Sequence, residues 1–133
     1  MAEVFYFHHL YYDLVFKVCL DFYAGDRQAV AEAVRKKYHY EIRDNCLGES
    51  VVMEDLKEKT ETQVIWIADV SNFYTLSHEL IHMVKNVFEK NKIPFAPDND
   101  ETIAYYHTYW FRRIWHDMGI YNDKKYKPVL KKP

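Results

Sequence analysis

The feature that most constrains the fold is an apolar run followed closely by an amphipathic segment in the middle of the chain. The run Gln63-Val64-Ile65-Trp66-Ile67-Ala68 is typical of a buried strand. After a short loop with capping candidates at Ser71, Asn72 and Thr75, apolar residues recur at helical spacing over about 73–90. These are Leu76, Leu80, Met83, Val84, Val87 and Phe88. The sequence therefore predicts a strand, a short loop and a helix with one buried stripe.

Two strands and a helix are expected before this unit. A strand with one buried face is predicted over residues 14–22, where Leu14, Phe16, Val18, Leu20 and Phe22 alternate with Val15, Lys17, Cys19 and Asp21. Residues 4–7 are expected to pair with it as a hairpin. An amphipathic helix is expected to begin at Gly25-Asp26. Its buried face would carry Ala29, Val30, Ala33 and Val34. Residues 40–55 are expected to hold one or two short strands, and residues 54–61 an exposed turn.

A last helix is expected over about 100–117, after the turn signals Pro94 and Pro97, with Gly119 as its C-terminal cap. This order of elements predicts an α+β fold: a small, mostly antiparallel sheet covered on one face by helices. We expect a single domain over residues 1–121 and a disordered, lysine-rich tail over residues 122–133.

Composition indicates a soluble globular protein. Apolar residues make up 49% of the 133 residues, enough for a core, and the net charge of -2 gives no strong attraction to nucleic acid. There is no apolar run of membrane-spanning length and no visible secretory signal, so we expect a cytoplasmic protein. The many aromatic residues are expected to fill the core, with a homodimer contact as the alternative.

The helix expected over 73–90 carries the pattern H-E-x-x-H at His78-Glu79-Leu80-Ile81-His82. Residues four apart lie one above the other on a helix, so His78 and His82 can bind one metal ion together. Glu79 lies about 100° around the helix, where it can reach a metal-bound water without being a ligand. The alternative is an accidental match, with two solvated histidines on a surface helix.

A third ligand is expected at the start of the last helix. A catalytic zinc site uses three protein ligands and one open position, and two histidines with a glutamate is a standard set. Glu101 lies nineteen residues after His82 and would face the metal if the last helix folded back against the motif helix. Asp100 is the main rival for this role and Asp98 a weaker one. All three are also acidic residues of the kind favoured at a helix N-terminus.

The segment His78-Glu-Leu-Ile-His82, followed by Asn99-Asp-Glu101-Thr-Ile-Ala-Tyr105, resembles the gluzincin group of zincin metallopeptidases. More narrowly, it resembles small zincin-like proteins of bacteriophages and prophages. The resemblance covers about residues 60–117. The metzincin group is excluded by Lys85, where that group needs glycine, and by the absence of a third histidine in the motif.

The resemblance implies a minimal zincin domain in which His78, His82 and Glu101 bind zinc and Glu79 is the general base. Tyr105, one turn beyond Glu101, would orient a ligand or stabilise the oxyanion, or else pack in the core. The site would lie between the last two helices and an edge strand that pairs with extended substrate.

Three functions remain open at this point. The first is a zinc metallopeptidase acting on a peptide or protein, phage-encoded and active in the host cytoplasm. The second is a zinc-binding but inactive phage accessory protein that acts through a protein partner. The third is an interaction module in which the motif is accidental. Glu79 distinguishes the first, because metal binding alone does not need it; neither nucleic acid nor a membrane is an expected partner.

Overall fold

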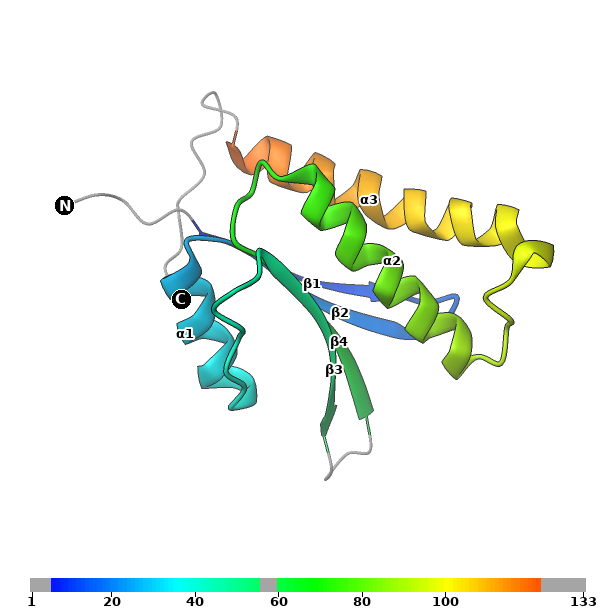
Figure 1. The fold of residues 1–133 in the computed structure, drawn as a ribbon, viewed down its shortest axis with the longest axis horizontal. Helices are drawn as coiled ribbons and strands as arrows, with labels where there is room; N and C mark the ends of the chain where they lie inside the picture. Colours follow the sequence, from blue (N-terminus) through cyan, green and yellow to red (C-terminus); the bar gives the residue numbers. More distant parts are fainter. Residues whose placement is uncertain (1–5, 56–59, 123–133) are drawn as a thin grey trace.

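A computed structural model describes residues 6–55 and 60–122 and contains a four-stranded sheet with helices on both of its faces (Figure 1). The strands are β1 (Tyr6–Asp13), β2 (Val18–Gly25), β3 (Gly48–Asp55) and β4 (Thr60–Ile67), in the spatial order β1-β2-β4-β3. The helices are α1 (Arg27–Tyr38), α2 (Phe73–Lys90) and α3 (Asp100–Asn122), and a short 3-10 helix η1 (Pro97–Asn99) precedes α3.

Two antiparallel hairpins make up the sheet and meet along a parallel pair at its centre. β1 pairs with β2 and β3 pairs with β4, both antiparallel. β2 and β4 are parallel, with Phe22 opposite Ile65, and the chain between them passes through α1 and β3. The expected α+β fold with a mostly antiparallel sheet is confirmed.

Each face of the sheet supports its own core. Phe22 and Ile65 pack with residues of α2 and α3 on one face, whereas Tyr23 and Trp66 pack with α1 on the other. The expectation that helices would cover only one face was therefore wrong. The central strands β2 and β4 are apolar on both faces, and leaving either face in water would forfeit its hydrophobic burial.

Helix α2 begins and ends where the apolar spacing predicts. The side chain of its N-cap residue Asn72 accepts a hydrogen bond from the Thr75 backbone N–H, at 3.1 Å. All six residues of the predicted stripe are buried. The loop before α2 follows the central strand β4, and the edge strand in contact with α2 is β3.

Helix α3 runs antiparallel to α2. Phe73 at the start of α2 contacts Trp115, whereas Phe88 near its end contacts Tyr106. The first turn of α3 therefore lies beyond the C-terminal end of α2, as Figure 1 also shows.

Three sequence predictions need correction or lie outside the described residues. Leu14 and Val15 belong to the exposed turn of the first hairpin, and β2 begins only at Val18. Gly119 does not cap α3, because the helix continues through it to Asn122. Residues 123–133, nearly all of the predicted tail, and residues 1–5 lie outside the described part of the chain.

Candidate metal site on helix α2

His78 and His82 lie one turn apart on the solvent-facing side of α2. Their Nε2 atoms are 3.2 Å apart and their rings are inclined at 79° to each other. Two nitrogen ligands of one tetrahedral zinc ion lie about 3.3 Å apart, given Zn–N bonds of about 2.05 Å. The pair therefore already has the spacing of two ligands to one ion. The same distance also fits a hydrogen bond between two neutral imidazoles.

Glu79 is turned to the buried side of α2 and is only 7% exposed. Burial raises the pKa of its carboxyl above the ordinary value, while the charges of His78 and His82 act in the opposite direction. A carboxyl with a raised pKa holds a proton more readily near neutral pH, which suits a general base that must later release the proton. Glu79 is therefore a buried carboxyl between two exposed histidines, and its role as the general base stays a prediction.

The structure does not bring Glu101 to the histidine pair. Because α2 and α3 are antiparallel, the first turn of α3 lies past the end of α2, and Glu101 is exposed there. Within residues 6–55 and 60–122, no three His, Cys, Asp or Glu side chains are grouped to hold a metal. The predicted three-ligand set is therefore not assembled in this part of the chain, and neither Asp98 nor Asp100 completes it.

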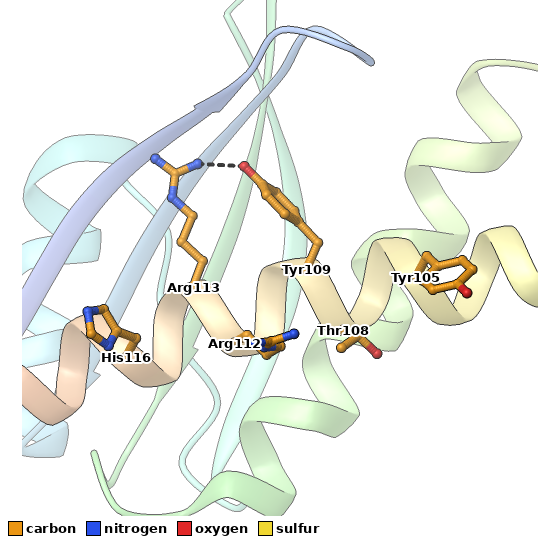
Figure 2. A pocket seen from close by; sticks show the side chains of 6 residues that line it. All are labelled: Tyr105, Thr108, Tyr109, Arg112, Arg113 and His116. Atoms are coloured by element: carbon orange, nitrogen blue, oxygen red, sulfur yellow. Dashed lines mark hydrogen bonds between the residues drawn. The ribbon is translucent and has the colours of Figure 1, made fainter.

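Tyr105 also lies apart from the histidine pair. It is 72% exposed and belongs to the outer face of α3, opposite the side that packs on the sheet (Figure 2). This face also carries Thr108, Arg112 and His116, and it is flanked by Tyr109 and Arg113, of which Arg113 lies over the ring of Tyr11 on β1. Tyr105 faces outward because the buried side of α3 is formed by Trp110, Ile114 and Met118, which lie on the opposite side of the helix. Tyr105 is therefore not a core tyrosine.

His107 of α3 contacts Ser77, the residue before the H-E-x-x-H motif, and the sequence did not predict this contact. The Nε2 atom of His107 lies 3.2 Å from Ser77 Oγ and 3.1 Å from Ser77 O, immediately before His78. Beyond it on α3, Phe111 stacks on Trp115. No spacing rule within α3 alone identifies His107, because its partner lies on another helix.

The opposite face of the sheet holds a second polar cluster, centred on Asp21. Its buried carboxylate accepts hydrogen bonds from the hydroxyls of Tyr23 and Tyr38, each at 2.6 Å, and contacts Lys37 and His8. Burial alone would raise the pKa of Asp21, but the hydrogen bonds outweigh it and hold that pKa below its usual range. With its oxygens already engaged, the carboxylate serves to join α1 to the sheet.

No protein-family model, curated protein or solved structure matches this chain. The likeness to gluzincins therefore rests on the motif residues and stays a prediction. None of the helices in the described ranges is both long enough and apolar enough to span a membrane.

Proposed function

We propose that this protein binds zinc through His78 and His82 and hydrolyses peptide bonds, with Glu79 as the general base. The observation that carries the proposal is the 3.2 Å separation of the two Nε2 atoms, next to a carboxyl that burial has made more basic. Helix geometry alone brings residues four apart together, so the burial of Glu79 beside the exposed pair is the feature that adds to the motif.

In this proposal the two histidines bind the metal ion and the glutamate transfers protons. Zinc bound by the pair would supply a Lewis acid that polarises the scissile carbonyl and lowers the pKa of a coordinated water. His78 and His82 would hold the ion through Nε2, and Glu79 would accept a proton from the attacking water and pass it to the leaving amine. Because the pair offers two protein ligands and a catalytic zinc site ordinarily has three, we expect weaker zinc binding than in a complete catalytic site.

A second candidate is a zinc-binding domain without hydrolytic activity that acts through a protein partner. The position of Glu101 favours it, because catalytic zinc sites ordinarily use three protein ligands and Glu101 lies outside the histidine pair.

The test combines metal content with hydrolysis. Untagged protein is loaded with zinc, dialysed and analysed for metal; we expect about one zinc per chain, lost in His78→Ala. The matched control is His39→Asn, since His39 is an exposed α1 C-cap in the left-handed conformation that asparagine tolerates. A mixed peptide substrate is then incubated with wild type and Glu79→Gln, with and without a chelator.

The outcomes separate the candidates. Chelator-sensitive cleavage that is lost in Glu79→Gln while zinc is kept supports the peptidase. Zinc binding without cleavage supports the inactive domain. A wild-type protein that retains no zinc contradicts both and leaves the motif accidental.

A further inference from the structure

The outer face of α3 carries a straight stripe of exposed side chains with opposite charges at its two ends. Glu101, Tyr105, Thr108 and Arg112 follow one another at spacings of four, three and four residues, which places them along one face of the helix. All four are exposed, and Tyr109, 46% exposed, flanks the stripe. Figure 2 shows this face from Tyr105 to His116.

The two charged ends of the stripe have no partner within the described chain. Across residues 6–55 and 60–122, neither Glu101 nor Arg112 has an opposite charge within 4.0 Å. Elsewhere on the surface, charges do pair: Arg35 lies 3.2 Å from Glu41, and Lys90 lies 2.9 Å from the half-buried Glu61. The acid and the arginine of α3 are thus both left available to another molecule.

Two exposed tyrosines occupy the middle of the same surface. Tyr105 and Tyr109 are large aromatic side chains with a polar tip, and tyrosine and arginine are enriched at protein interfaces. Arg113 beside them donates a hydrogen bond of 2.9 Å to the hydroxyl of Tyr109 and lies over the ring of Tyr11. The tyrosine is therefore held in place before any partner binds, which lowers the entropy lost on association.

We propose that this face binds a second copy of the chain, with the two α3 helices antiparallel across a two-fold axis. The stripe is self-complementary about one point, because positions 101 and 112 and positions 105 and 108 share the same midpoint. A two-fold axis at that point places Glu101 opposite the partner's Arg112, and Tyr105 opposite the partner's Thr108. The dimer then contains two ion pairs, each between Glu101 of one chain and Arg112 of the other.

The charge pattern favours a second copy over a polyanion. A nucleic acid would meet Glu101 as a repulsive group about 16 Å along the helix from Arg112. The chain is also net negative. Because exposed ion pairs each contribute little, we expect a dimer that depends on protein concentration and weakens as salt is added.

The test is a charge reversal with rescue, followed by sedimentation equilibrium over a concentration series. Glu101→Arg and Arg112→Glu each place like charges opposite one another, so each variant should dimerise about tenfold more weakly or not at all. A one-to-one mixture of the two variants should form a heterodimer, since positions 101 and 112 are then both positive in one chain and both negative in the other. The double variant Glu101→Arg/Arg112→Glu should dimerise like wild type.

Several outcomes would overturn the proposal: a wild type that stays monomeric throughout the series, single variants that dimerise unchanged, or a mixture that fails to associate. Lys85→Glu reverses an exposed charge on α2, outside this face, and should leave the dimer intact. Circular dichroism and thermal unfolding check that each variant folds, which we expect because both substituted side chains are exposed. The zinc content of Arg112→Glu should not change, because Arg112 is not a candidate metal ligand, so its dimerisation result is independent of the proposed metal site.

Discussion

The ammonium of Lys37 lies 2.9 Å from the carboxylate of Asp21, whose side chain is completely buried between the sheet and α1. Lys37 comes from the last turn of α1 and Asp21 from the middle of β2. Lys37 and the hydroxyls of Tyr23 and Tyr38 replace the hydrogen bonds to water that the carboxylate loses on burial, and so offset its desolvation cost. This cluster holds α1 on the face of the sheet that is turned away from the candidate metal site.

Asp21→Asn should lower the free energy of unfolding at neutral pH by about 2–4 kcal/mol, because it removes a buried charge that holds several hydrogen bonds. The pKa of Asp21 is lowered in the folded protein, so its stabilisation is present above the ordinary aspartate pKa and is lost as the pH falls below it. Urea unfolding of wild type and Asp21→Asn at neutral and acid pH measures the difference in their free energies of unfolding. The exposed residue Asp44, changed to Asn, is the control. A difference that stays constant on acidification would contradict the argument.

Glu79→Gln should raise the free energy of unfolding at neutral pH while abolishing any hydrolysis. Burial raises the pKa of the Glu79 carboxyl, so its ionised form costs stability above the ordinary glutamate pKa. The gain from glutamine should shrink as the pH falls below that value, where the wild-type carboxyl is protonated in both states. Unfolding curves across this range test the sign. The exposed Glu89, changed to Gln on the same helix, should show no such trend.

Gly48→Ala should destabilise the protein by about 1–3 kcal/mol through overpacking. An added Cβ would lie 2.8 Å from the backbone oxygen of Trp66 and 2.8 Å from the Thr75 methyl, where β3 meets the start of α2. Gly119→Ala is the matched comparison, because nothing lies within 4 Å of its added Cβ. As this glycine lies inside α3, alanine there should stabilise by about 0.5–1 kcal/mol. Thermal melts of both variants would disagree with the packing argument if the two shifts had the same sign.

Zinc should protect the wild-type protein against heat. A ligand that binds only the folded state adds about 2.7 kcal/mol when its free concentration is a hundred times its dissociation constant. His82→Ala removes one of the two nitrogens at 3.2 Å and should abolish the zinc-dependent rise in Tm, whereas His39→Asn should keep it. An equal rise in His82→Ala would place the bound zinc elsewhere.

The spacing of apolar residues predicted a helix or strand well where a single pattern ran along its whole length. The stripe from Leu76 to Phe88 predicted α2 and its buried side, and Asn72 was one of three capping candidates. The histidine pair followed from the helix, because i and i+4 neighbours are set by the helix itself. The strand boundary at Leu14 was missed because an alternating pattern continues unchanged into an exposed turn.

What the sequence by itself determined is therefore local: an α+β set of elements, a helix with His78 and His82 on one side, and a glutamate between them. Only the tertiary structure decided where Glu101 and Tyr105 lie, which face α1 covers, and that Asp21 is buried among its donors. The reason is physical. The phase and direction of α3 depend on which of its sides buries more apolar surface against α2 and the sheet, and a count of nineteen residues from His82 carries no information about that choice.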